Sequence, residues 1–332
     1  MKQNMDKSQT GQALGVVCAL AASGLFGFSF LATKVAVSQA PVFSLLSWRF
    51  IMAFAAMSLC AALGIFKIQL KGKSLWPLLF VSLFQPILYF LGETFGLTRI
   101  SSSESGTIIA CIPLITLLLM PILTKEQPTR WQWVSITISV LGVILVGATK
   151  GAAASFSLAG YLLVMLAAVS DAVFLNLTRR FSAYTGVERS YVMAGVGAVV
   201  FTAIALIENG LAGTLSTFFL LPFHNQAFLL GCLYLAVGCS VIAYILRNLA
   251  ISRPGPGRAG SFAGATTLVS VLAGVLLLDE GFDLLQGLGT LLVLMGVYGA
   301  NALPRAALSA EAVQPGALQP GTLQPGTLQP GT

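Results

Sequence analysis

Ten apolar runs, each long enough to cross a lipid bilayer, are separated by short polar connections along this chain of 332 residues. A helix of about 20 residues spans the roughly 30 Å hydrocarbon core of a bilayer, so each run is typical of one transmembrane helix. Charged residues make up only 9% of the sequence, against about 25% in soluble domains, whose surface must face water. The sequence therefore predicts an all-α integral membrane protein with ten transmembrane helices, at about residues 13–36, 42–64, 75–98, 103–123, 131–149, 157–178, 190–208, 226–249, 257–278 and 283–303.

The basic residues fall mainly on one side of this predicted topology. If the N-terminus lies in the cytoplasm, 14 of the 18 Lys and Arg residues fall on the cytoplasmic side. The other four are Lys34, Arg49, Arg99 and Lys150. Cytoplasmic connections of membrane proteins carry such an excess of Lys and Arg. We therefore expect a multi-pass protein with both termini in the cytoplasm.

Several function classes are disfavoured by what the sequence contains. The net charge of +7 does not indicate a nucleic-acid partner, because the basic residues lie in short connections between apolar runs. The five Cys residues lie inside apolar runs and form no CxxC pair, so we expect neither a metal nor another cofactor. The chain has no HExxH or GxSxG motif for an intramembrane enzyme, and no GxxxxGK[ST] motif for ATP hydrolysis.

The two halves of the chain resemble each other. A shift of 145 residues aligns Thr33-Lys34 with Thr178-Arg179, and a shift of 154 aligns the segment ending at Glu126 with the one ending at Glu280. Two units of five helices in one chain must insert in opposite orientations, which predicts an inverted repeat suited to alternating access. The expected organisation is a cytoplasmic N-terminus, a first repeat, a linker, a second repeat and a disordered tail, at 1–12, 13–149, 150–156, 157–303 and 304–332.

A known family shows a similar pattern. The residues that carry the likeness are the stretch Gly24–Phe30, Lys34, Pro41, Arg49-Phe50, Ile112-Pro113-Leu114 with Glu126 thirteen residues after the proline, and Leu141-Gly142-Val143. Over about residues 13–303 the chain resembles the EamA type of the drug/metabolite transporter superfamily, whose members carry two five-helix repeats. It departs from the pattern at Thr267, which replaces the second-half proline, and at Asp171, where the family often has an aromatic residue. The resemblance implies export of amino acids or similar metabolites across a bacterial inner membrane.

Ionisable residues within a membrane span are candidate functional residues, because each costs about 2.5–3.5 kcal/mol at a helix centre on insertion scales. Asp171 lies near the centre of the sixth run and Glu93 in the outer half of the third. We expect either of them to bind substrate or protons, although a structural Asp171 bonded to a neighbouring Ser or Thr stays open. Arg247 aligns with Glu93 under the shift of 154. It either contributes to a zwitterion site or extends to the cytoplasmic interface.

Polar and aromatic residues at similar depth complete the predicted pocket. Arg49, which we assign a gating or structural role, lies about two turns into the second run, deep enough to need a carboxylate or a substrate anion. Lys34 is expected to extend to the interface. Tyr and Trp side chains offer stacking area together with a hydrogen-bonding group. The remaining residues assigned to the pocket are Ser29, Trp48, Gln85, Tyr89, Asn176, Tyr244 and Asn248.

Four residues are expected to shape helices instead of binding substrate. Pro86 and Pro113 lie within the third and fourth runs and predict kinks, because proline lacks the N–H that a helix needs. Such kinks suit either gating or static packing. Glu126 and Glu280 each follow a long apolar run, which favours a structural, capping role at the membrane edge.

The sequence thus predicts a secondary transporter, as an exporter of small polar metabolites such as amino acids, with a central site between the repeats. Asp171 and Glu93 make proton coupling our hypothesis. A facilitator or uniporter, or a multidrug exporter of the same fold, remains an alternative, and an intramembrane enzyme or a membrane scaffold is a remote one. The expected partners are the solute, protons and membrane lipid, with the chain as a monomer or homodimer.

Overall fold

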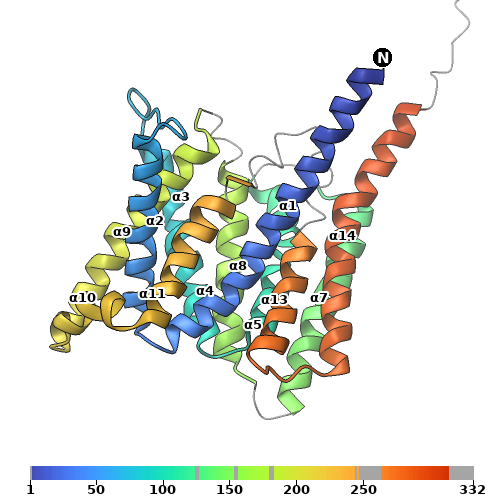
Figure 1. Ribbon diagram of the computed structural model, residues 1–332. Coiled ribbons are helices and arrows are strands. Elements are labelled where there is room, and N and C mark those ends of the chain that lie inside the picture. Colours follow the sequence, from blue (N-terminus) through green and yellow to red (C-terminus); the bar gives the residue numbers. More distant parts are fainter. Residues whose placement is uncertain are drawn as a thin grey trace, which may run out of the picture.

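The structure, a computed structural model, is a bundle of helices with no strand in the part of the chain that it describes (Figure 1). It describes residues 2–123, 127–152, 156–178, 183–243, 245–246 and 263–313. The elements are α1 (Lys2–Val37), α2 (Val42–Ala62), α3 (Trp76–Ser82), η1 (Leu83–Leu88), α4 (Tyr89–Leu97), α5 (Ser102–Ile109), α6 (Ile112–Leu123), α7 (Arg130–Ala152), α8 (Leu158–Thr178), α9 (Gly186–Leu211), α10 (Leu215–His224), α11 (Gln226–Leu233), η2 (Tyr234–Ala243), α13 (Ala263–Leu277) and α14 (Leu284–Val313).

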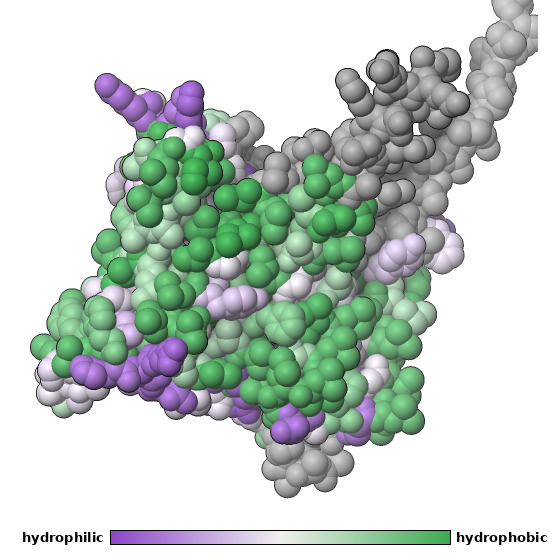
Figure 2. All heavy atoms as spheres, viewed as in Figure 1, coloured by the Kyte–Doolittle hydropathy of each residue, from purple (hydrophilic) through white to green (hydrophobic). Residues whose placement is uncertain are grey.

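Among the described residues, eight helical segments are long and apolar enough to cross a membrane, from Leu14–Val37 to Gln226–Ala243. Two shorter apolar helices, Gly264–Leu277 and Leu284–Ala300, occupy the positions of the ninth and tenth predicted runs. Hydrophobic residues cover most of the visible face, and strongly hydrophilic ones gather toward its opposite edges (Figure 2). The predicted all-α membrane fold is confirmed, while the count of ten spanning helices stays a prediction.

Three of the described spans are irregular, and in the eighth α11 passes into the π-helical segment η2. In the third, α3 passes into the π-helical segment η1, where Gln85 has non-helical torsions of φ −138° and ψ 114°. Pro86 follows it and has no N–H to donate, so the regular hydrogen-bond ladder is interrupted there. In the fourth, α5 ends at Ile109 and α6 begins at Ile112, with Pro113 in its first turn. Both prolines therefore lie beside a break in helical geometry.

Helices from the two halves of the chain pack against each other. α7 contacts α14, α2 contacts α9, and α1 contacts α13. At the crossing of α7 and α14, a Cβ atom on Gly142 would lie 2.5 Å from the carbonyl oxygen of Gly289, and one on Gly289 would lie 2.7 Å from that of Gly142. Small residues let helices approach closely in lipid, where apolar burial gives little driving force for association. These glycines thus permit the close contact between α7 and α14.

The terminal helices are longer than the sequence predicts. α1 begins at Lys2, well before the first apolar run, and α14 continues to Val313. The helix α14 thus includes 304–313, which the sequence assigns to a disordered tail, and the segment Arg305–Ala312 is rich in alanine, the strongest helix former. The division of the chain into domains stays a prediction. Outside the described residues lie 314–332 and four predicted site residues, Glu126, Tyr244, Arg247 and Asn248.

Candidate functional site

A cavity of about 270 Å³ is lined by segments from both halves of the chain: α1, α2, η1 and α4 from the first, and α8, α9 and η2 from the second. Its lining reaches Thr178, the last residue of α8, and Arg189 in the first turn of α9. The cavity therefore extends toward the end of the bundle at which α8 stops and α9 starts. Its polar lining residues are Arg49, Gln85, Asp171, Thr178, Arg189, Ser190 and Ser240.

Arg49 places a cation in the wall of this cavity. It is only 5% exposed and lies seven residues after the start of α2, which is about 10 Å along the helix. Its guanidinium carbon lies 4.2 Å from the centre of the Phe90 ring, a cation–π contact. The Nε atom of Arg49 has no hydrogen-bond partner among the described residues.

Asp171 and Gln85 line the same cavity from α8 and η1. Asp171 interacts with another residue, so its carboxylate is not isolated. It does not pair with Arg49, because the ion pairs within the described ranges are Lys34–Glu280 and Lys73–Glu188. The non-helical backbone at Gln85 lies at the level of the cavity, where irregular backbone is tolerated in a membrane protein.

Tyr89 and Glu93 form a pair on α4, outside the residues that line the cavity. The Tyr89 hydroxyl donates to Oε1 of Glu93 at 3.2 Å, as expected for residues four apart on a helix. Glu93 is only 3% exposed, and its Oε2 atom has no hydrogen-bond partner among the described residues. Because Tyr89 is adjacent to the cavity residue Phe90, with ring centroids 4.8 Å apart, the pair lies one residue behind the cavity wall.

Three other predicted pocket residues make structural contacts and do not line the cavity. The Asn176 amide donates to the carbonyl oxygens of Thr116 and Ala172, at 3.1 and 3.0 Å, and joins α8 to α6. Trp48 donates to the carbonyl oxygen of Phe218 in α10 at 3.1 Å, and Ser29 to that of Phe26 at 2.6 Å. Of the predicted pocket residues that the structure describes, Gln85 and Asp171 line the cavity together with Arg49.

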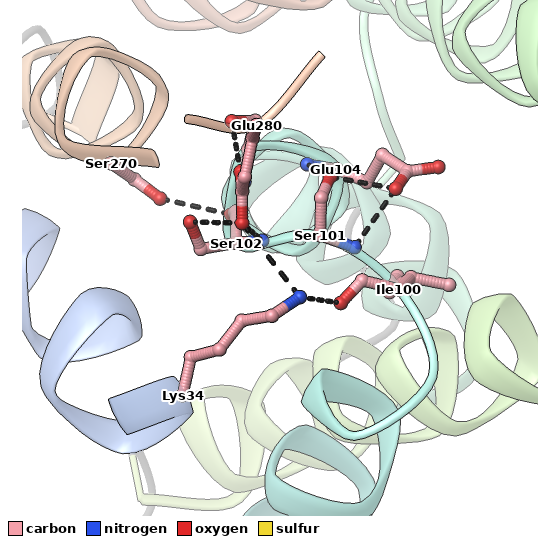
Figure 3. Close-up of polar contacts among 8 residues, drawn as sticks. Lys34, Ile100, Ser101, Ser102, Glu104, Ser270 and Glu280 are labelled. Atoms are coloured by element: carbon pink, nitrogen blue, oxygen red, sulfur yellow. Dashed lines mark hydrogen bonds and ion pairs between the residues drawn. The ribbon is translucent and has the colours of Figure 1, made fainter. Parts of the chain in front are cut away.

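Glu280, just after α13, caps the N-terminus of α5 (Figure 3). Its Oε1 accepts from the backbone N–H and the hydroxyl of Ser102, at 2.7 and 2.9 Å. Its Oε2 accepts from the same groups of Ser103, at 3.0 and 2.6 Å. Lys34 at the end of α1 lies 3.7 Å from Oε1 of Glu280 and donates to the carbonyl oxygen of Ile100 at 2.7 Å. We call Lys34, Ser102, Ser103 and Glu280 the Glu280 cluster.

The contacts of Glu280 favour the charged form of its carboxyl group. Burial alone would raise the pKa of the Glu280 carboxyl, but hydrogen bonds from Ser103 and Ser102 outweigh that effect and hold its pKa below the usual value. The position at a helix N-terminus also favours a negative charge. Lys34, which the sequence predicts to extend to the interface, has a side chain 32% exposed and finds partners for its ammonium group in Ile100 and Glu280.

Both halves of the chain match the model of a known protein family. The model of the EamA-like transporter family matches residues 13–148 and again residues 158–302, so most of the chain is covered. This chain belongs to that family. The resemblance inferred from its sequence is confirmed.

Relatives of this EamA protein carry transporter names. It is 35% identical over 292 residues to the uncharacterized transporter YcxC of Bacillus subtilis, covering 87% of this chain and 93% of that one. It is 25% identical over 278 residues to an uncharacterized transporter of Archaeoglobus fulgidus, covering 82% and 93%. A protein of known crystal structure superposes with a TM-score of 0.58 at 18% identity, over 87% of this chain and 98% of that one, which shows the fold alone. The names point to a transporter and not to an enzyme.

The structure adds residues to the site of this EamA protein that its sequence did not single out. Arg189 and Ser190 in the first turns of α9, Ser240 in η2 and Phe90 in α4 all line the cavity. Sequence reasoning assigned Arg189 to the cytoplasmic charge excess and had no signal for Phe90, one of 21 Phe residues. A guanidinium near a helix start faces a cavity or the interface depending on the rotation of that helix. Hydropathy does not report this rotation.

Proposed function

We propose that this EamA protein is a secondary transporter that moves small polar metabolites through the cavity, with amino acids as the first class to test. The observation that carries the proposal is a cavity lined by both halves that contains Arg49, Asp171 and Arg189. Charged groups in a membrane span are costly, and in transporters they mark the path of a polar solute or ion. A cavity of about 270 Å³ suits a solute of metabolite size.

Alternating access between two inverted repeats is the proposed mechanism. It is supported by helix contacts that persist when the halves are exchanged: α7 with α14, α2 with α9, and α5 with α13. Likewise α1 of the first half contacts α13 of the second half. The counterpart of α1 is α8, the counterparts of α13 are α5 and α6, and α8 contacts both of them. Two halves with equivalent neighbours can exchange their arrangements around a central site.

The two ends of the cavity region differ, which supports an inward-facing arrangement in this structure. The cavity reaches Thr178 and Arg189, which the charge distribution assigns to the cytoplasmic side. At the opposite end the Glu280 cluster joins α1, α5 and the segment after α13. We propose that transport toward the outside requires this cluster to separate. The proposed setting is a bacterial inner membrane with both termini in the cytoplasm.

Proton coupling is the proposed energy source. Asp171 lines the cavity, and Glu93 interacts electrostatically with the cavity residue Arg49. Both carboxyls are proposed to exchange protons with the solute pathway. The chain contains no GxxxxGK[ST] motif for ATP hydrolysis. If proton movement drives the solute outward, the protein is an exporter. A facilitator would respond only to the gradient of its solute.

The experiment is a transport assay with the full chain in proteoliposomes, against a panel of amino acids, nucleobases, sugars and cationic drugs. We expect saturable movement of polar metabolites that depends on an imposed pH gradient, and a loss of that dependence in Asp171→Asn. Movement of cationic drugs alone would assign the protein as a multidrug exporter. If no solute moves or binds, the transporter proposal fails and a scaffold or enzyme takes its place.

A further inference from the structure

Arg49 is a buried cation whose donors are not satisfied by the described residues. A guanidinium is charged at all physiological pH values and carries five N–H donors. Among the described residues, no hydrogen bond or ion pair uses the Arg49 side chain, and its Nε atom is buried without a partner. Buried polar groups in folded proteins almost always have partners. Since Arg49 also lines the cavity, an acceptor within the cavity can supply a partner for its guanidinium.

Aromatic residues lie around the guanidinium of Arg49. Its carbon lies 4.2 Å from the centre of the Phe90 ring, and Phe90 is itself packed edge-on against Phe50 at 5.1 Å and Tyr89 at 4.8 Å. A cation–π contact does not use the guanidinium N–H groups as hydrogen-bond donors to an acceptor atom. The guanidinium can therefore offer the two parallel donors that match a carboxylate while it contacts Phe90.

Neither nearby carboxylate takes this role. Glu93 acts on Arg49 electrostatically but accepts its hydrogen bond from Tyr89, and it forms no ion pair with Arg49. Asp171 shares the cavity and interacts with another residue, and the ion pairs within the described ranges do not include one between Asp171 and Arg49.

We propose that Arg49 is the anion-binding residue of the transport site and that the solute carries one carboxylate group, bound by the guanidinium through paired hydrogen bonds. This inference rests on the proposed function, because it specifies the solute of the same cavity. It makes Arg49 a determinant of specificity that favours carboxylates over cationic drugs.

The test uses matched derivatives of any amino acid that the wild-type protein transports in proteoliposomes. Its carboxamide lacks the carboxylate and keeps the amine, whereas its N-acetyl derivative keeps the carboxylate and lacks the amine. We expect the carboxamide to compete about ten- to hundredfold more weakly than the parent, since a charge-assisted hydrogen-bonded contact is lost. The N-acetyl derivative should compete at least tenfold better than the carboxamide.

Variants of Arg49 test whether this residue is the one that recognises the carboxylate. Arg49→Gln should abolish discrimination between amino acid and carboxamide, and Arg49→Lys should retain part of it because the charge remains. Arg99→Gln is the matched control, because Arg99 is exposed and lies outside the cavity lining. Size-exclusion chromatography and thermal unfolding show whether each variant is folded. If Arg49→Gln does not fold, competition by the two derivatives is measured on the wild-type protein and on Arg49→Lys. These measurements then test whether Arg49 binds the carboxylate.

The outcomes separate this inference from the proposed function. Transport of an amino acid with equal competition by its carboxamide would overturn the role of Arg49 and leave the transporter standing. Unchanged discrimination in a folded Arg49→Gln protein would overturn it too. When phosphate monoesters are added to the panel, transport confined to them would also overturn the proposal that the solute carries a carboxylate. If no panel member moves, the proposed function itself fails.

Discussion

The Nζ atom of Lys34, at the end of α1, lies 3.7 Å from Oε1 of Glu280, which follows α13. The two residues come from different halves of the chain and meet at the N-terminus of α5, where Glu280 accepts four hydrogen bonds from Ser102 and Ser103. Three segments are thus joined by one carboxylate with a side-chain exposure of 9%. Contacts of this kind, buried and charge-assisted, are worth more than surface ion pairs.

Glu280→Gln should lower the stability of the protein by about 2–3 kcal/mol, because hydrogen bonds to a charged acceptor contribute roughly 1.5–3 kcal/mol each and glutamine keeps one acceptor oxygen. Thermal unfolding of the purified protein in detergent measures the change. The control is Asp279→Asn, which removes a neighbouring exposed charge at a residue with φ of 51°, a conformation that asparagine tolerates. An equal loss of stability in both variants would contradict the assignment to the Glu280 contacts.

The same variant tests the proposed exchange between inward- and outward-facing states. Weakening the Glu280 cluster should increase the fraction of molecules open on the outer side. In a protein whose only remaining cysteine is the cavity residue Cys239, Glu280→Gln should label faster with a membrane-impermeant thiol reagent added outside. Unaltered labelling, in a variant confirmed to be less stable, would show that the cluster does not control access.

Stability should depend on pH through Glu280. Its pKa is lowered in the folded protein from the model-peptide value of 4.5, so the unfolded chain takes up a proton at higher pH than the folded one does. The contribution is therefore fully present above about pH 4.5 and is lost as the pH falls through the lower, folded value. The difference in melting temperature between wild type and Glu280→Gln should shrink on acidification across this range. A difference that grows as the pH falls would contradict the lowered pKa.

Gly142→Ala should destabilise the protein by about 1–3 kcal/mol, because the new Cβ atom would lie 2.5 Å from the carbonyl oxygen of Gly289 and force α7 and α14 apart. Gly24→Ala is the matched control, since a Cβ atom there has no neighbour within 4 Å. It should leave the melting temperature unchanged or raise it, because alanine is the better helix former. Melting curves of the two variants give the comparison, and similar values would refute the close helix contact.

Asp171→Asn or Glu93→Gln should leave solute movement insensitive to an imposed pH gradient, because either substitution removes a carboxyl group proposed to exchange protons. Uptake by proteoliposomes with and without a gradient is the measurement. Glu208→Gln removes an exposed carboxylate in α9 and should keep the response of the wild type. Full gradient-driven transport in both test variants would end the coupling hypothesis.

Hydropathy and charge in the sequence alone were enough to predict the membrane class and the approximate positions of the helices, while short motifs such as Gly24–Phe30 and Ile112-Pro113-Leu114 carried the resemblance to the family. These are properties of local segments: an apolar run of about 20 residues crosses a bilayer whatever its neighbours are. The sequence also pointed to Asp171, Gln85 and Arg49, since a charge or amide at that depth is costly and therefore informative. The cost of placing a carboxylate in a membrane span applies to Glu93 and Asp171 alike. It therefore could not show that Asp171 lines the cavity and Glu93 does not.

Only the tertiary structure decided which polar groups meet. Asn176 faces the backbone of α6 instead of the cavity, Arg189 reaches the cavity from the start of α9, and Glu280 caps a helix that begins 178 positions earlier in the sequence. Each of these outcomes depends on the rotation of a helix about its own axis and on the neighbour that it packs against. Both are set by contacts such as those at Gly142 and Gly289, between residues far apart in the chain. A local pattern of apolar residues carries no record of them.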